Sequence, residues 1–485
     1  MRPLRTVLFW ALSGALVAGH AIVAWDSLVV TRLWEDEAFN LTVPLNLLAG
    51  LGYTSDGALS GSTLTPFDPR ISTGVSVLLP AAAVLATGVD PVIGARLVPL
   101  AFWLLLLVGV AVLGHRIGGR WAALVAAGVP LAFHSGLTIS PIQGPADLLG
   151  EIPAAALIVC ALVVLPRRTW LAGLLLGFAV QAKLIALLAL PAFVVALWIL
   201  APGHGAKRLG TAVRRSWIPL ALVALPTFLV EIAAILSLGL SGYIGHLRSL
   251  AGFVRSGGQT YPPTTPVQKL GTLLDAWFVP WPLTLLISLT TAGLIVGGFL
   301  LTRRSQESIP QVVCYTVVAS AIGIAAYVGW WSTASHLPLW VRHPAPGVYA
   351  FLPILAAGAV WGAQVLSRSH LPLSRVATAF GSALLAAGIG AAGALHAAST
   401  FTPDWETLAT QRGAVDPIRA WVAENDVKWL AAQPWGGATS AVVLSGAHLG
   451  LFDAPAMDDE PRVTVDPCPG EVLVDGAMYR VCSAP

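Results

Sequence analysis

The feature that most constrains this chain is a succession of long apolar runs joined by short polar connections. Many of the runs approach or exceed the roughly 18–20 residues that a helix needs to cross a bilayer. Charged residues make up 11% of the 485-residue chain, against about 25% in soluble domains. We therefore predict an α-helical polytopic membrane protein.

The apolar runs and their flanks predict about eleven membrane spans. The predicted spans are residues 7–25, 95–113, 120–134, 151–165, 170–182, 184–200, 217–238, 276–300, 311–331, 346–366 and 374–397.

Basic residues gather in connections that alternate along the chain, namely Arg2/Arg5, Arg116/Arg120, Arg167/Arg168, Lys207–Arg215, Arg303/Arg304 and Arg368/Arg375. Glu307 is the acid within these connections, whereas the other acids, Glu231 apart, fall on the opposite side. The positive-inside rule therefore predicts a cytoplasmic N-terminus in an inner or plasma membrane. The first run follows two arginines as in a signal peptide but lacks a clear cleavage site, so we expect a retained signal anchor.

Residues 73–88 are apolar, but counting them as a span would place Arg116 and Arg120 outside. We predict instead a juxtamembrane or re-entrant helix within a first outer loop, residues 26–94. The membrane domain then covers residues 1–397 and includes a second outer loop, 239–275. Clusters of Gly and Pro in that second loop predict mobility.

Residues 398–485 are more polar and contain no predicted span, so we expect a small extracytoplasmic α/β domain. Its pattern predicts a helix near 413–425 and strands near 428–433, 440–445 and 471–481. Cys468 and Cys482 lie on the oxidising side of the membrane. A disulfide between them and two free thiols both remain open, because a sequence does not show their separation.

Three adjacent carboxylates follow the first span, in Trp34–Asn40, WEDEAFN. Glu35, Asp36 and Glu37 repel one another and do not help packing in lipid. Such a triplet is either a solvated charge run or part of a cavity where one acid takes a proton.

The triplet opens a longer pattern: Asp36–Glu37, Gly52–Tyr53, the segment from Thr73–Gly74 to Gly88, and Ala95–Arg96. This order resembles the first outer loop of the GT-C membrane glycosyltransferases, which use polyprenyl-phosphate sugars and include protein O-mannosyltransferases and aminoarabinose transferases. The similarity covers roughly residues 1–200. It extends to Gly150–Pro153 and to Lys183 after a glycine-rich helix. A departure is Asp68–Ser72, DPRIS, where the aminoarabinose type carries charged residues including lysine.

The resemblance implies a GT-C architecture and an inverting glycosyltransferase on the outer face. It implies Asp36 as general base and Glu37 as its supporting acid, with Glu35 solvated. Asp147 and Glu151 stand at span ends where they would orient the acceptor, although Asp147 suits a helix cap equally well. Alternatively, Asp147 and Glu151 would bind a divalent cation with Asp36, chiefly through Asp36 and Glu151, and oxygen ligands favour Mg²⁺ or Mn²⁺.

Phosphate of the leaving polyprenyl group calls for cations. The candidates are Arg96, Lys183, Arg248, Arg255 and Arg342. Lys183 falls between two apolar helices, where a charge is costly and usually functional, although a lysine reaching to the interface explains it too. Arg342 beside Trp340 could also be a simple interfacial anchor.

The partners implied are the lipid bilayer, a polyprenyl-phosphate-linked sugar donor, and a lipid, glycan or protein acceptor. No nucleic-acid pattern, Walker A loop or dinucleotide glycine motif is present. Two alternatives remain. An O-antigen ligase or polymerase would depend on outer-loop Arg248, Arg255 and Arg342 with His343. A lipid-linked-sugar transporter or flippase would need charges inside the spans, where Glu231 stands.

Overall fold

The computed structural model describes residues 2–57, 63–67, 73–134, 140–256, 261–369, 372–402 and 406–484. The chain divides into two compact units. Unit 1 comprises Met1–Val23, Phe102–Gln143 and Glu151–Thr402, and unit 2 comprises Ala24–Ala101, Gly144–Gly150 and Pro403–Pro485.

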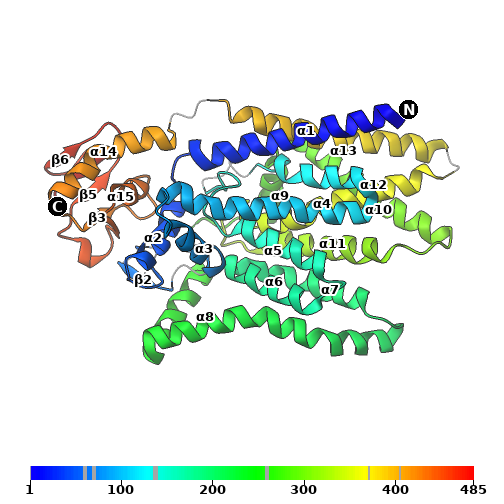
Figure 1. Cartoon of the computed structure of the whole chain (residues 1–485), viewed down its shortest axis with the longest axis horizontal. Coiled ribbons are helices and arrows are strands. Elements are labelled where there is room, and N and C mark those ends of the chain that lie inside the picture. Colours follow the sequence, from blue (N-terminus) through cyan, green and yellow to red (C-terminus); the bar gives the residue numbers. More distant parts are fainter. Residues whose placement is uncertain are drawn as a thin grey trace. The chain divides into compact units, whose positions relative to one another are not determined.

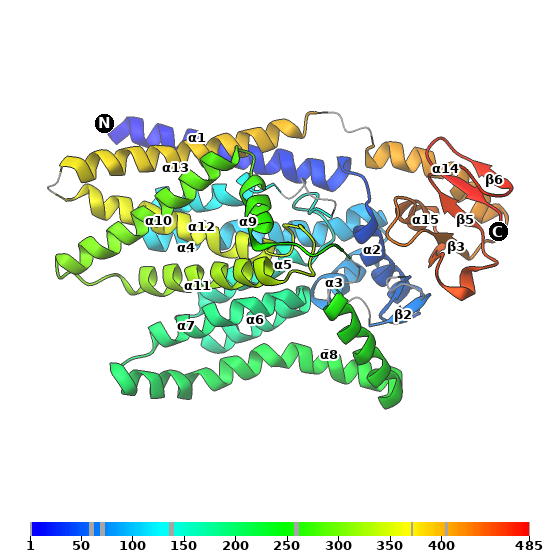
Figure 2. The ribbon, with the colours of Figure 1, turned by 180° about the vertical axis from the view of Figure 1, so that it is seen from behind.

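Unit 1 is a helical bundle whose long helices lie side by side in both ribbon views (Figures 1 and 2). Its helices, two of which begin or end in unit 2, are α1 (Arg2–Trp25), α4 (Pro91–Ala132), α5 (Glu151–Val164), α6 (Thr169–Ala182), η2 (Leu184–Ala189), α7 (Leu190–Leu200), α8 (Gly205–Ser256), α9 (Pro266–Asp275), α10 (Trp281–Arg304), α11 (Gln311–Thr333), α12 (Ala345–Ser367) and α13 (Pro372–Ser399).

Seven helices in the described part of the chain are long and apolar enough to cross a membrane. They are Leu4–Val30, Pro91–Ala132, Gly205–Gly252, Trp281–Arg304, Gln311–Thr333, Ala345–Ser367 and Thr378–Ser399. The shorter apolar helices Glu151–Val164, Thr169–Ala182 and Leu184–Leu200 cover three more predicted spans. Two predicted spans fall in α4, on either side of a break at Gly118 and Gly119. The prediction of an α-helical multi-pass membrane protein is confirmed.

Glycines let neighbouring helices of unit 1 approach closely. A Cβ on Gly362 of α12 would lie 2.1 Å from the carbonyl oxygen of Leu294 in α10. A Cβ on Gly173 of α6 would lie equally close to the carbonyl oxygen of Pro219 in α8. Such contacts stabilise membrane bundles, because lipid supplies no hydrophobic drive between helices and close packing must replace it.

The segment 239–275, expected as an outer loop, is largely helical. Helix α8 continues to Ser256 after a break at Gly239, and α9 forms at Pro266–Asp275. Thr265 caps α9 by accepting a hydrogen bond from the backbone N–H of Gln268. Glycine at 239 bends the chain without ending the helical run, and the prediction that this segment is a mobile outer loop stays a prediction.

Unit 2 begins with η1 (Asp26–Val30) and α2 (Glu35–Leu48), followed by the antiparallel pair β1 (Thr54–Asp56) and β2 (Leu64–Pro66), and by α3 (Val75–Leu85). A five-stranded sheet in the order β4-β3-β5-β7-β6 completes it. The strands are β3 (Trp429–Ala432), β4 (His448–Leu451), β5 (Arg462–Thr464), β6 (Val472–Asp475) and β7 (Arg480–Cys482), with α14 (Leu408–Glu424), α15 (Thr439–Ser445) and η3 (Pro455–Met457) between them.

Strand β3 pairs in parallel with β4 and β5, whereas β7 pairs antiparallel with β5 and β6. Helix α3 agrees with the short helix expected within residues 73–88, and α14 with the helix near 413–425. The strand expected at 440–445 is wrong, because Thr439–Ser445 is helix α15. That run is buried almost throughout, and a short buried apolar run does not distinguish strand from helix.

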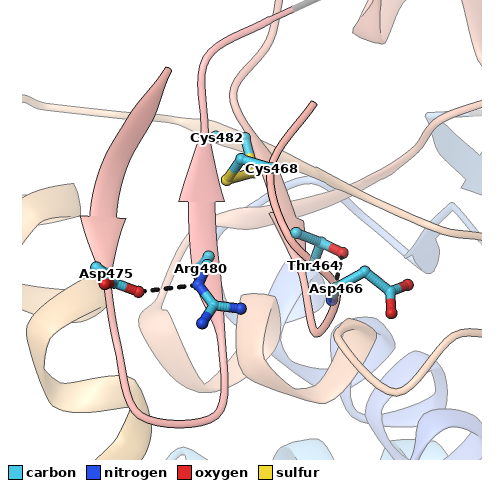
Figure 3. The surroundings of a disulfide bond; sticks show 6 residues. All are labelled: Thr464, Asp466, Cys468, Asp475, Arg480 and Cys482. Atoms are coloured by element: carbon cyan, nitrogen blue, oxygen red, sulfur yellow. Dashed lines mark hydrogen bonds and ion pairs between the residues drawn. A yellow bond between two sulfur atoms is a disulfide. The ribbon is translucent and has the colours of Figure 1, made fainter. Parts of the chain in front are cut away.

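Cys468 and Cys482 form a disulfide, which resolves the alternative left open above. Figure 3 shows it joining the end of β7 to the segment after β5, beside the Arg480–Asp475 pair, whose Nε and Oδ1 atoms are 2.9 Å apart. The bond fastens the segment after β5 to strand β7.

Candidate active site

The acidic triplet forms the first turn of α2. Trp34 precedes it in an extended conformation, and Glu35, Asp36 and Glu37 occupy the first helical positions. Carboxylates are favourable there, because the N-terminus of a helix carries a partial positive charge. Asp36 is 9% exposed and Glu37 is 1% exposed, so the triplet is not a solvated charge run.

Glu35 was expected to be solvated, and this was wrong. Its side chain is 17% exposed and lies 3.5 Å from the guanidinium of Arg32. Burial raises the pKa of Glu35, while Arg32 acts in the opposite direction. The expectation failed because residues distant in sequence cover this turn.

Glu37 binds Arg96 through both carboxylate oxygens. Arg96 Nε donates to Oε1 at 2.7 Å and Nη2 to Oε2 at 2.6 Å. The remaining N–H groups of Arg96 donate to the carbonyl oxygens of Leu28, Thr31 and Arg32. All five donors of this guanidinium are thus engaged. Arg96 therefore anchors α2 and the preceding turn, with Glu37 as its counter-ion, and the phosphate-binding role expected for Arg96 stays a prediction.

Asp147 lies close to the same turn within unit 2. The indole Nε1 of Trp34 donates to both its carboxylate oxygens, at 3.0 and 3.1 Å. The neighbouring backbone N–H of Leu148 donates to Glu37 Oε1, and Asn40 Nδ2 donates to the carbonyl of Leu148. The structure thus brings Asp36, Glu37, Arg96 and Asp147 together.

The C-terminal part of unit 2 also supports the triplet, which the sequence did not indicate. Arg32 lies 3.4 Å from the carboxylate of Glu406, which in turn accepts a hydrogen bond from the hydroxyl of Tyr479. Gln411 donates to the carbonyl of Leu33 and accepts from its N–H, both at 2.9 Å. The sequence shows only that Glu406, Gln411 and Tyr479 lie in a polar segment. It does not indicate that they contact the residues before α2.

In unit 1, the predicted residues Glu151 and Lys183 form an ion pair. Lys183 Nζ lies 2.8 Å from Glu151 Oε1, and the Glu151 side chain is 1% exposed. Lys183 is extended between α6 and η2, and this interruption turns its side chain toward the start of α5. A buried carboxylate at this position depends on its cation.

Arg342 and His343 precede α12 and belong to a cationic region of unit 1. The Arg342 guanidinium lies 5.1 Å from the ring centre of Trp340, and Arg342 is 9% exposed. Burial lowers the pKa of His343 well below its ordinary value, and the nearby charges of Arg342, Lys183 and Lys269 lower it further. The charges of Arg342, Lys183 and Lys269 thus act on the same imidazole.

Lys269 was not singled out from the sequence, yet it is fully buried. Its Nζ donates to the carbonyl oxygen of Trp331 at 2.6 Å and to that of Ala334, at the end of α11. Burial lowers its pKa to about 8. A lysine in an amphipathic helix resembles any surface lysine in the sequence, so its burial was not predictable.

The structure does not bring Arg248 into this cluster. Arg248 is exposed and lies on helix α8, in the segment that was expected to be an outer loop. The side chain of Arg255 lies outside the described residues. Lys183, Lys269 and Arg342 are thus the lysines and arginines whose charges act on His343.

A metal site was expected from Asp36 and Glu151. Among the described residues, no group of three or more His, Cys, Asp or Glu side chains is placed to hold a metal ion. Glu151 faces Lys183 instead, which balances its charge. The two predicted ligands belong to different units.

No protein family model matches the chain, and no curated protein matches it by sequence. Solved structures do match. The crystal structure of ArnT from Cupriavidus metallidurans in the apo state has a TM-score of 0.58 at 13% identity, covering 100% of this chain and 98% of that chain. The same protein bound to undecaprenyl phosphate gives 0.59 at 13% identity, covering 98% of both chains.

The Archaeoglobus fulgidus oligosaccharyltransferase in complex with Zn and sulfate has a TM-score of 0.51 at 12% identity, covering 91% of this chain and 62% of that chain. At such identities the likeness concerns the fold. The chain has the GT-C fold, as its sequence resemblance predicted.

Proposed function

We propose that this protein is an integral membrane glycosyltransferase that moves a sugar from a polyprenyl-phosphate donor to an acceptor on the outer side of the membrane. The GT-C fold supports this reaction class. Similarity to a protein whose structure contains undecaprenyl phosphate supports a lipid-linked donor. The acceptor is a lipid, a cell-wall glycan or a protein.

The observation that carries the proposal is the first turn of α2. Glu37 is held by Arg96, and Glu35 faces Arg32, so both flanking carboxylates have a positional role. Asp36 stands between them at the position that the GT-C resemblance assigns to the base. We therefore assign the proton transfer to Asp36 and the positioning of its helix turn to Glu37.

In the proposed reaction, an acceptor hydroxyl or amine attacks the anomeric carbon from the face opposite the phosphate. The bond from carbon to the phosphate oxygen breaks, so the configuration inverts and polyprenyl phosphate leaves with both electrons. Asp36 takes the acceptor proton. Correct placement of such a base contributes about 10²–10⁴ in rate.

Cations stabilise the negative charge that develops on the leaving phosphate. We assign this role to Lys183 and Arg342 and add Lys269, because the charges of these three residues all act on His343. Asp147 and Glu151 remain assigned to acceptor orientation. The expected Mg²⁺ or Mn²⁺ stays a prediction, and no step of the proposed mechanism requires it.

Asp36→Asn tests the proposal. It removes the proton acceptor while keeping size and polarity, so transfer from labelled polyprenyl-phosphate sugars in membranes should fall by about 10²–10⁴. Glu35→Gln is the matched control: it removes the adjacent charge but keeps an oxygen that can accept from Arg32, so this variant should retain most activity. Wild-type transfer by Asp36→Asn would refute the assignment of the base.

The two alternatives give different results. A ligase or polymerase that depends on outer-loop Arg and His would lose activity in Arg342→Gln and His343→Gln but keep it in Asp36→Asn. A flippase would move labelled lipid-linked sugar across a sealed vesicle without transferring it.

A further inference from the structure

A small cationic cavity lies in unit 1 at the far end of α5 from Glu151. Its volume is about 230 Å³, and it is lined by Arg116, Val163, Pro166, Arg167, Leu200, Gln311, Val312 and Tyr315. No acid is among these described lining residues. Since α5 runs from Glu151 to Val164, at 1.5 Å per residue the cavity is about 20 Å from the Lys183–Glu151 pair.

The cavity has a built polar wall. Arg116 Nη1 donates to the carbonyl of Val163 at 2.8 Å, which fixes this arginine against the end of α5. Tyr315 is 2% exposed, and its hydroxyl lies 3.3 Å from the carbonyl of Leu162. Among the described residues, neither Arg116 nor Arg167 forms an ion pair with a carboxylate. Both arginines are exposed, so the cavity presents two accessible positive charges that no carboxylate among the described residues pairs with.

Tryptophans mark this end of the bundle as a membrane interface. Trp170, at the start of α6, is 50% exposed, and Trp198, near the end of α7, is 47% exposed. Exposed tryptophans gather at the level of lipid headgroups. The connections from α7 to α8 and from α10 to α11 lie at the same end as the N-terminus (Figures 1 and 2).

We propose that this cavity binds the phosphate of an anionic membrane lipid. Two arginines match a phosphate in charge and in hydrogen-bond geometry. The apolar wall of Val163, Leu200 and Val312 suits the glycerol and the first carbons of the acyl chains. Basic pockets between helices on one membrane face are suited to anionic headgroups. Such a lipid ties together α4, α5, α7 and α11, and it plays no part in the proposed transfer reaction.

The test uses the full chain in dodecylmaltoside micelles with added phosphatidylglycerol or phosphatidylcholine. Phosphatidylglycerol should raise the midpoint of thermal unfolding more than phosphatidylcholine does, because it binds the folded state. Replacing both arginines by glutamine should weaken phosphatidylglycerol binding about 25-fold, at about fivefold for each basic residue. Native mass spectrometry of the retained lipid measures this directly.

Arg303→Gln with Arg304→Gln is the control, because these exposed arginines end α10 and do not line the cavity. The single variant Arg167→Gln should fold normally, because the Arg167 side chain makes no hydrogen bond within the described residues. It therefore separates a loss of lipid binding from a loss of folding. If inorganic phosphate raised the unfolding midpoint as much as phosphatidylglycerol does, the cavity would be a phosphate site whose ligand is a soluble phosphate. An undiminished phosphatidylglycerol effect in the Arg116 and Arg167 variants would overturn the proposal.

Discussion

Glu37 and Arg96 are buried charges, and each depends on the other for its stability. Their carboxylate and guanidinium groups are 2% and 1% exposed. Removing one partner of such a pair costs about 3–5 kcal/mol, because the other charge stays buried without compensation. Arg96→Gln should therefore lower the free energy of unfolding by about that amount, measured by thermal or denaturant unfolding in detergent.

The matched control is Arg412→Gln, which breaks the pair with Asp90 at 2.7 Å. The side chains of Arg412 and Asp90 are 33% and 41% exposed, so the loss of this pair should cost at most about 1 kcal/mol. Equal losses in the two variants would contradict an anchoring role for Arg96.

His448 makes the stability of unit 2 depend on pH. Its Nδ1 lies 3.1 Å from Asp56 Oδ2, and this hydrogen bond raises the pKa of His448, while Arg412, Arg419 and Asp90 line the same cavity. Protonated His448 therefore stabilises the fold fully below its unfolded pKa of about 6.5. The contribution disappears as pH rises through the higher folded-state pKa.

His448→Gln keeps a donor toward Asp56 but does not titrate. Between about pH 6 and pH 8, the unfolding midpoint of the wild type should fall by about 1–2 °C more than that of the variant. Parallel curves for the two proteins would show that this bond does not set the pH dependence.

The sequence indicated the acids of the site better than their partners. Asp36, Glu37 and Asp147 stood out because a carboxylate beside an apolar run needs an explanation. Gln411 did not stand out, because its contact with Leu33 joins positions 378 residues apart in the chain. Lys269 resembled a surface lysine, and only the fold shows it to be buried.

At the scale of a single element, helix α8 depends on Gly239. This residue has φ 68° and ψ 168°, in the middle of a 52-residue helical run. Side chains strongly disfavour that conformation. Gly239→Ala should therefore destabilise the protein by about 1–3 kcal/mol or straighten the helix, as measured by thermal unfolding and by spin-label distances across the break.

Gly245→Ala is the control in the same helix. A Cβ there would meet no atom within 4 Å, and Gly245 is not among the glycines with positive φ. Alanine should be neutral or stabilising by about 1 kcal/mol. If both substitutions behaved alike, the break at Gly239 would have no conformational cost.

Helices were predictable from the sequence to the extent that apolar length decided them. All eleven predicted spans overlap helices, since a run in lipid must satisfy its own backbone hydrogen bonds. Residues 440–445 lie outside that constraint, and their short apolar run fits a strand and a helix equally well. Strands β4 and β5 were missed, because four- and three-residue strands leave too few residues for an alternating pattern.

At the scale of the whole molecule, the sequence does not predict which segments make up unit 2. It joins the segments Ala24–Ala101, Gly144–Gly150 and Pro403–Pro485 into one compact body. Contacts such as Arg32 with Glu406 hold it together. The predicted domain boundary between residues 397 and 398 rests on a change in amino-acid composition. The two compact units are defined instead by long-range contacts of this kind.

Orientation in the membrane follows from charge and can be measured on the full chain. Thr87 and His115 are exposed positions before and after the first part of α4. With Cys160 and Cys314 replaced by serine, and Cys468 and Cys482 joined in their disulfide, single cysteines at 87 and 115 report sidedness. A membrane-impermeant thiol reagent should label Thr87→Cys in intact cells, and His115→Cys only after permeabilisation, because the arginines near residue 115 favour the cytoplasmic side. Labelling of His115→Cys in intact cells would mean that residues 73–88 cross the membrane. Every later loop would then move to the other face, which would separate Asp36, before that segment, from Lys183 and Arg342 after it.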